Sequence, residues 1–238
     1  MKKYVFLLLI LPAFAPLAAG QGIMQDVMAG ALVNPEVGVY AWYTLTDAET
    51  EREFFLRQAI VAEEKVKRKT GWWVETEIIP RVGHPAVYKM LLTGPASDPD
   101  NIHQIIVQEG GGLPHKVEVD KSAKPDKAED AKRVSQGLVE LTTEEGAVQA
   151  EHFLIETPTG KSQVWLNADI RPMGIVRMET AQGVLMLTRH GKGGPEAIST
   201  LGPVTDEKAG VGNAPSRNFN VRVEKGKRTL PDIPEQKE

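Results

Sequence analysis

The 238-residue chain contains no cysteine. Disulfide bonds, a thiolate nucleophile and cysteine-bound metal sites are therefore excluded, so the fold must be stabilised by an ordinary apolar core. After the first residues there is also no apolar run of about 18 residues, the length that a membrane-spanning helix needs. Acidic residues (32) outnumber basic ones (28), which argues against nucleic acid or anionic lipid headgroups as electrostatic partners.

The first residues have the pattern of a cleavable signal peptide. Two lysines precede an apolar run from Tyr4 to Leu11, and small residues follow up to Gly20. This run is too short to span a membrane, so we expect residues 1–20 to be removed on export. The mature chain is then expected in the periplasm, or outside a cell that has a single membrane. Without cysteine it has no site for an N-terminal lipid anchor.

Two segments contain too few large apolar residues to join a core. The first, at about 120–136, consists almost entirely of charged or small residues, and the second, 191–238, is rich in glycine, proline and charge. We interpret the first as a charged insertion, either mobile or a surface helix, and the second as a mostly disordered C-terminal tail. A single domain at 21–190 remains.

Alternation of apolar and polar residues predicts β-strands on both sides of the insertion. Residues 37–45 form the first strand, and 53–63 are expected to pair with 71–79 in a hairpin. Four more short strands follow, at 148–155, 161–168, 175–180 and 184–190. Because tight turns join these four strands, we expect an antiparallel meander.

Three other stretches predict short helices. Residues 24–33 place apolar side chains three or four positions apart, and 85–93 is a second candidate. Asp98 and Pro99 are a typical helix start before an apolar-periodic run that Gly110 ends. We therefore expect an α+β fold, a single curved and mainly antiparallel sheet whose apolar face is covered by short helices.

Residues 146–190 carry a more specific pattern. A strand leads to the turn Thr157-Pro158-Thr159-Gly160, then to a strand from Val164 to Asp169, and Pro172 precedes the strand Gly174–Glu179. This order resembles the C-terminal meander of bacterial exported proteins related to the lipoprotein-localisation carriers, which have the LolA/LolB-like half-barrel fold. The upstream sequences GWWVETEI and LLTGPASDPDNI also look like this group.

The resemblance implies an incomplete barrel of antiparallel strands with helices as a lid over a hydrophobic cavity. In the carriers this cavity accepts acyl chains. The charged insertion and the long tail depart from the family pattern, and no ligand-binding residue can be carried over. The identity of a ligand therefore does not follow from the resemblance.

The tryptophans are candidates for contact with a ligand. Trp72 and Trp73 are adjacent on one predicted strand and must face opposite sides, so one of them needs cover from a helix, a partner or a ligand. The alternative is that the tryptophans pack the core. For an apolar ligand on the covered face, we predict these contact residues: Tyr43, Trp72, Val74, Met178 and Leu187.

No catalytic, metal or cofactor site is predicted. The tripeptide Arg189-His190-Gly191 matches the centre of histidine phosphatases, but those enzymes need it after the first strand of an α/β fold. Here it ends the last predicted strand. The five histidines show no metal-ligand spacing, and no GxSxG, Walker or GxGxxG pattern occurs.

These observations predict a non-enzymatic exported protein that binds an apolar ligand, a lipid or a lipoprotein acyl chain, between the sheet and the helices. One alternative is a structural or interaction protein of the cell envelope, with a self-packed core and a protein partner. A third is a hydrolase whose turnover depends on His190.

Overall fold

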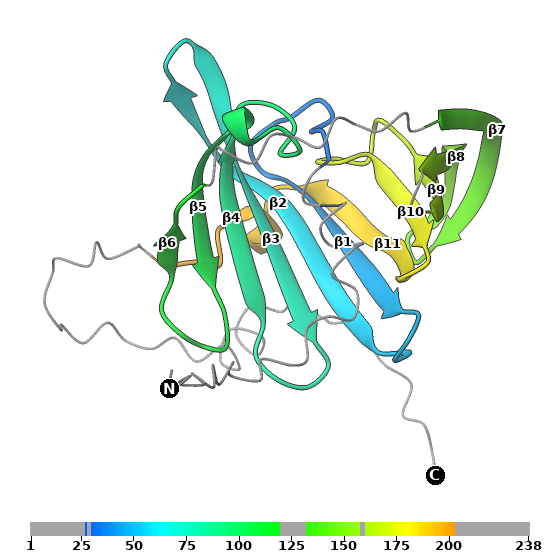
Figure 1. Cartoon of the computed structure of the whole chain (residues 1–238), viewed down its shortest axis with the longest axis horizontal. Coiled ribbons are helices and arrows are strands. Elements are labelled where there is room, and N and C mark those ends of the chain that lie inside the picture. Colours follow the sequence, from blue (N-terminus) through cyan, green and yellow to red (C-terminus); the bar gives the residue numbers. More distant parts are fainter. Residues whose placement is uncertain (1–26, 28–29, 120–131, 158–159, 203–238) are drawn as a thin grey trace, which may run out of the picture.

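The computed structural model describes residues 27, 30–119, 132–157 and 160–202. They form one antiparallel sheet of 11 strands in the order β6-β5-β4-β3-β2-β1-β11-β10-β9-β8-β7 (Figure 1). The strands are β1 (Val39–Asp47), β2 (Glu53–Val66), β3 (Lys69–Pro80), β4 (Ala86–Leu92), β5 (Ile102–Gln108), β6 (His115–Val117), β7 (Lys132–Thr143), β8 (Gly146–Thr157), β9 (Gly160–Leu166), β10 (Ile175–Thr180) and β11 (Gly183–Lys192). Two single 3-10 turns complete the secondary structure, η1 (Pro99–Asn101) and η2 (Pro195–Ala197).

The expected α+β fold is wrong, because the expected helices at 85–93 and after Asp98 are the strands β4 and β5. Both faces of β4 are largely covered, so its apolar residues do not alternate and its sequence resembles a buried helix. The helix start at Asp98 is realised only as η1, where the Asp98 side chain accepts from the backbone N–H of Asp100.

The expected helix at 24–33 falls largely outside the described residues, since only Val27 and residues 30–33 are described. Val27 itself is helical and is buried against the sheet. The other described residues include no α-helical residue. Nor does the described part of the chain contain a helix that is long and apolar enough to cross a membrane.

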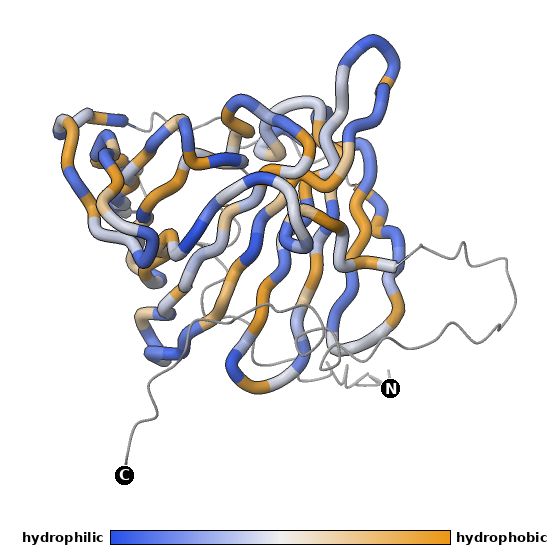
Figure 2. Tube along the Cα trace, turned by 180° about the vertical axis from the view of Figure 1, so that it is seen from behind, coloured by the Kyte–Doolittle hydropathy of each residue, from blue (hydrophilic) through white to orange (hydrophobic). Residues whose placement is uncertain are grey.

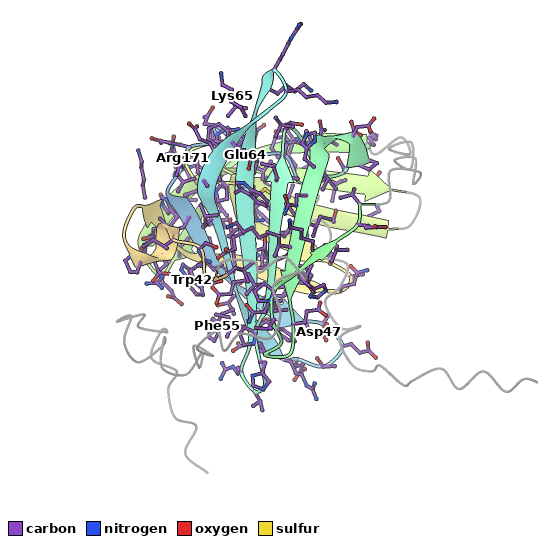
Figure 3. The ribbon with its side chains drawn as sticks, turned by 90° about the vertical axis from the view of Figure 1, so that its left-hand side faces the viewer. Trp42, Asp47, Phe55, Glu64, Lys65 and Arg171 are labelled. Atoms are coloured by element: carbon purple, nitrogen blue, oxygen red, sulfur yellow. The ribbon has the colours of Figure 1, made fainter. Side chains whose placement is uncertain are left out.

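The predicted strand pairings are confirmed. β2 and β3 form a long antiparallel hairpin in which Leu56 lies opposite Ile78, and β8 to β11 form the expected meander. Lys67 adopts a positive φ of 55° in the hairpin turn. The hydrophilic tip of this hairpin projects beyond the rest of the sheet (Figures 1 and 2), and Lys65 lies near it (Figure 3).

The folded chain differs from the expected domain boundaries at two places. Residues 120–131 of the charged segment lie outside the described residues, but 132–136 belong to β7. The boundary expected at residue 190 falls inside β11, and the chain continues as a covering segment to Gly202. Residues 203–238 lie outside the described residues.

The sheet is strongly curved. Strands β1 to β6 form one wall and β7 to β10 form a second wall at an angle to it, with β11 between them (Figure 1). The turn between β7 and β8 returns to β11, where the backbone N–H of His190 donates to the Glu145 carboxylate at 3.2 Å. The larger core cluster includes residues of both walls, for example Leu56 of β2 and Trp165 of β9.

Strands β1 to β4 have two buried faces. Side chains alternate between the faces along a strand, and residues opposite each other in neighbouring strands share a face. The core face carries apolar residues such as Tyr43, Leu56 and Ile78. The opposite face carries Trp42 and Arg57 and is covered by residues 195–201, which we call the strap.

Candidate functional site

The five predicted ligand-contact residues lie in two separate apolar clusters. Tyr43, Met178 and Leu187 belong to the larger cluster, whereas Trp72 and Val74 belong to a smaller one. Tyr43 and Leu187 are each 1% exposed and Val74 is 2% exposed. Trp72 and Met178 are partly buried against the same clusters. The chain's own side chains therefore surround three of the five residues.

Two segments outside the sheet cover the core face. Val27 and Leu32 from the N-terminal segment pack on the larger cluster, together with Ile170 and Met173 from the loop between β9 and β10. The two segments are joined by a hydrogen bond from the Val33 N–H to the Pro172 carbonyl, at 2.8 Å. Among the described residues, the apolar face is thus covered by helical Val27, by the segment around Leu32 and by the loop between β9 and β10.

Two polar atoms stand out inside this region. The Tyr43 hydroxyl and the Gln58 side-chain oxygen are buried and have no hydrogen-bond partner among the described residues. Burial raises the pKa of Tyr43, so its hydroxyl stays protonated at physiological pH. The Gln58 amide contacts the Thr76 hydroxyl at 3.5 Å. A buried polar atom without a hydrogen-bond partner lowers the free energy of unfolding. These two oxygens are therefore unusual for a buried face.

The opposite face contains a buried charged cluster that sequence reasoning did not identify. Arg57 lies between Glu75 and Glu77, and all three side chains are 0% exposed. The Arg57 Nε donates to Glu77 at 2.9 Å, and one terminal nitrogen donates to Glu75. The other terminal nitrogen donates to the backbone carbonyl of Glu196 at 2.7 Å. Each of the three guanidinium nitrogens thus has an acceptor.

The strap is attached to this cluster through Glu196. The Trp42 indole N–H donates to one carboxylate oxygen of Glu196 at 3.0 Å, and Arg189 forms an ion pair with the other at 3.2 Å. The Arg189 guanidinium also lies 5.2 Å from the centre of the Trp42 ring, a cation–π distance. Figure 3 shows Trp42 beside the orange end of the described chain. Glu196 therefore joins β1 and β11 to the strap.

The second half of the strap is held by Glu75 and Lys89. The backbone N–H of Thr200 and the hydroxyl of Ser199 both donate to the Glu75 carboxylate, the first at 2.7 Å. The Lys89 ammonium donates to the Ser199 hydroxyl at 3.2 Å. Leu201 then packs with Val87 and Ile106 in a third apolar cluster, against Trp73.

The prediction that Trp72 and Trp73 face opposite sides is confirmed. Trp72 packs on the cluster of Val74, whereas Trp73 packs on the cluster of Leu201 at the end of the strap. Leu201 of the strap therefore helps to cover Trp73, so the chain itself supplies the cover.

A sequence signal for the charged cluster was present. Glu75 and Glu77 are two positions apart on a predicted strand and must share a face, and Arg57 interrupts the apolar run of the strand expected to pair with it. The hairpin register, which places Arg57 opposite Glu77, decides that they meet. No pattern in residues 195–201 indicated that they would cover this cluster.

The histidine-phosphatase tripeptide occupies a structural position. The Arg189 side chain is engaged by Glu196, and the His190 backbone by Glu145. Among the residues that the structure describes, no three histidine, aspartate or glutamate side chains lie close enough to hold a metal ion. The other grouped charges, Arg57 with Glu75 and Glu77, have no exposed surface through which a substrate would reach them.

A surface pocket of about 310 Å³ lies where the β7–β8 turn approaches β11. It is lined by Thr44, Thr142, Thr143, Glu144, Met186, Leu187 and Thr188. Two of the threonine hydroxyls already donate to backbone carbonyls, Thr143 to Gly146 and Thr188 to Trp42. Of the predicted ligand-contact residues, Leu187 alone is among those that line this pocket.

No family model and no curated protein matches the chain. Among solved structures, the chain is similar to a Bacteroides fragilis protein described as exported, with a YmcC-like fold. The two are 13% identical, the similarity covers 68% of this chain and 100% of that chain, and the TM-score is 0.36. Such a likeness carries no argument about this chain, and the resemblance to the LolA/LolB group stays a prediction.

Proposed function

We propose that the chain is an exported, non-enzymatic interaction protein of the cell envelope, whose core is filled by its own side chains. The supporting observation is the burial of Tyr43, Val74 and Leu187 within the chain's own apolar clusters. A lipid-carrying protein needs such residues to line a cavity, because the binding energy comes from burying the acyl chain, at about 0.8 kcal/mol per methylene. Here the same surfaces are already buried.

The non-enzymatic part of the proposal is supported by the hydrogen bonds of the buried charged side chains. Each nitrogen of the buried Arg57 guanidinium has an acceptor, and the Glu75 carboxylate accepts from Arg57, Ser199 and Thr200. General acid–base catalysis needs a titratable group within hydrogen-bond reach of a substrate. These groups instead bind one another and the strap.

A second candidate function, binding of an apolar ligand with a polar end, has one specific observation in its favour. The Tyr43 hydroxyl and the Gln58 oxygen are buried on the core face without partners among the described residues. A ligand group that donates a hydrogen bond would satisfy the Gln58 oxygen, and one that accepts a hydrogen bond would satisfy the Tyr43 hydroxyl. Its entry would require displacement of the loops around Leu32 and Met173.

The test is to express residues 21–238 in a bacterial periplasm, purify the protein without detergent, and record native mass spectra followed by lipid extraction. We expect the bare protein mass in repeated preparations. A stoichiometric lipid or acyl species would contradict the self-packed core and support the second candidate.

A positive test of the interaction role uses a photo-crosslinking amino acid at exposed apolar positions in the periplasm. Suitable positions are Val82, Leu113, Leu138 and Ile198, which are 90%, 74%, 76% and 63% exposed. A partner that binds one surface gives a discrete adduct at some positions and none at the others, so the positions act as controls for one another. The absence of an adduct at every position would contradict the proposal.

A further inference from the structure

The sheet ends in a long strand that is paired on one side only. β7 is the last strand of the sheet order and pairs with β8, and no other described strand pairs with it. It has 12 residues, most of them exposed, whereas the strand at the opposite edge, β6, has three. A long open edge offers unpaired backbone N–H and C=O groups to another strand, and native proteins commonly cover such edges.

The side chains of β7 indicate what would cover it. Val139 and Leu141 pack against the larger core cluster but are only partly buried, although the end of β7 near Thr143 approaches β11. Leu138 and Glu140 lie on the other face of β7 and are exposed, Leu138 by 76%. A covering strand should therefore be apolar on one face and polar on the other.

The charged residues near the end of β7 indicate which charge a covering strand should carry there. Residues 138–145 contain three glutamates, Glu140, Glu144 and Glu145, and no basic residue. All three are exposed. Opposite charges on adjacent strands stabilise a pair, so the part of a covering strand beside Glu140 should be basic. Glu144 and Glu145 lie in the turn after β7, and Lys132 and Arg133 make the first end of β7 basic.

One segment of the chain outside the described residues has these properties. In residues 217–225 (RNFNVRVEK) Phe219, Val221 and Val223 alternate with polar residues, and the segment lies between Pro215 and Gly226. Such alternation of aromatic and β-branched residues between turn residues is typical of a strand. The segment contains three basic residues and one acidic residue.

The segment can reach β7 within the same molecule. The described chain ends at Gly202, next to Leu201, which packs against residues of β4 and β5. Four strand spacings, about 20 Å, separate β4 from β11, and the β7–β8 turn lies against β11. A fully extended chain of 14 residues, the number between Gly202 and Arg217, spans at most about 45 Å.

We propose that residues 217–225 pair with β7 of the same molecule as a twelfth strand. Phe219, Val221 and Val223 then lie on the side of Val139 and Leu141, and the polar residues of the segment, Arg222 among them, lie on the side of Glu140. This inference is independent of the proposed function. The pairing nevertheless affects the proposed interaction role, because a partner that adds a strand at β7 must first displace this segment.

Engineered disulfides test the pairing directly, since the chain has no cysteine of its own. Leu138→Cys is combined, in the full mature chain, with a single cysteine substitution at each position from 218 to 223. Residues that share a face of paired strands come within disulfide distance, so cross-linking should alternate. We expect cross-linking at Asn218, Asn220 or Arg222 to exceed that at Phe219 and Val221 several-fold, in a species of monomer mass.

The matched control places the fixed cysteine at Val82, which is 90% exposed between β3 and β4. Equal cross-linking to Val82→Cys and Leu138→Cys, or the same yield at all six positions, would overturn the proposal. A disulfide-linked dimer would overturn the intramolecular pairing.

Hydrogen exchange gives a second readout that needs no cysteine. In the full chain, the amides of 138–142 should exchange at least several-fold faster in the Val221→Pro variant than in the wild type, because proline disrupts strand pairing. Unchanged exchange in β7 would also overturn the pairing.

Discussion

The two faces of strands β1 to β4 are buried in different ways. The core face is apolar and is closed by loops that carry Leu32 and Met173, which make non-directional contacts. The strap face is built around Arg57, and the covering segment is held by hydrogen bonds and an ion pair to defined atoms of Glu196 and Thr200. The same four strands therefore have one face covered mainly by apolar packing and the other mainly by polar contacts.

The two faces differ in how strictly each fixes the position of the segment that covers it. Apolar packing accepts many segments of suitable volume and loses little on volume-conserving substitution. A buried ion cluster contributes little net stability, since desolvation offsets the Coulombic attraction, but removal of one partner leaves a buried charge. We therefore expect the strap to be fixed in register by its polar contacts, and the core face to contribute most of the net stability.

The substitution Arg57→Ala should have the largest effect. It leaves the carboxylates of Glu75 and Glu77 buried without their cation, and it removes a donor to the strap. We expect the free energy of unfolding to fall by about 3–5 kcal/mol. Urea unfolding followed by tryptophan fluorescence measures it.

Two controls accompany this variant. Arg57→Lys keeps the charge but loses the planar fork that bonds both glutamates, so it should recover only part of the stability. Arg81→Ala removes an exposed arginine that pairs with Glu53, and should change stability by less than about 1 kcal/mol. If Arg57→Ala were no more destabilising than Arg81→Ala, the cluster would not hold the sheet and the strap together.

On the core face, Leu187→Ala should reduce the free energy of unfolding by about 3 kcal/mol, by loss of apolar burial and formation of a cavity. Leu187→Met, which keeps the volume, should change it by less than about 1.5 kcal/mol. Urea unfolding measures both variants. A small loss of unfolding free energy for Leu187→Met, beside a larger loss for Arg57→Lys, would show that the core face tolerates a conservative substitution better than the strap face does. A large loss with Leu187→Met would contradict non-specific packing.

Glu196→Gln should have a smaller effect that is confined to the strap. The amide keeps one acceptor for the Trp42 indole but loses the ion pair with Arg189. We expect a loss of about 1–2 kcal/mol. The amides of 197–201 should exchange faster while those of β9 stay protected, which is measured by hydrogen exchange. Equal changes in both regions would show that the strap does not open separately.

The alternation of apolar and polar residues was sufficient to predict most of the strands. The hairpin of β2 and β3 and the meander of β8 to β11 consist of neighbouring segments joined by short turns, so pattern and pairing agree. β4 and β5 were misassigned because both of their faces meet other parts of the chain, which removes the alternation. β7 was missed because residues 132–136 belong to the stretch of charged and small residues, and because exposed Leu138 interrupts the alternation of apolar and polar residues.

The candidate site was less predictable than the fold. Tyr43, Val74 and Leu187 were correctly placed in apolar surroundings, but a sequence pattern does not show whether a ligand or the chain itself fills them. The strap depends on contacts between residues more than 100 positions apart, such as Trp42 with Glu196. No local pattern encodes such a pairing.

The smallest effect, and the one with opposite sign, is expected for Tyr43→Phe. The substitution removes a buried hydroxyl that has no partner among the described residues and leaves the ring in place. With a self-packed core, the free energy of unfolding should rise by about 1 kcal/mol, because the desolvation cost of the hydroxyl disappears. The related core variant Tyr43→Leu controls for the ring and should be destabilising. If Tyr43→Phe instead lowers the unfolding free energy of protein purified from the periplasm, the hydroxyl has a bound partner, and ligand binding on the core face would replace the self-packed core.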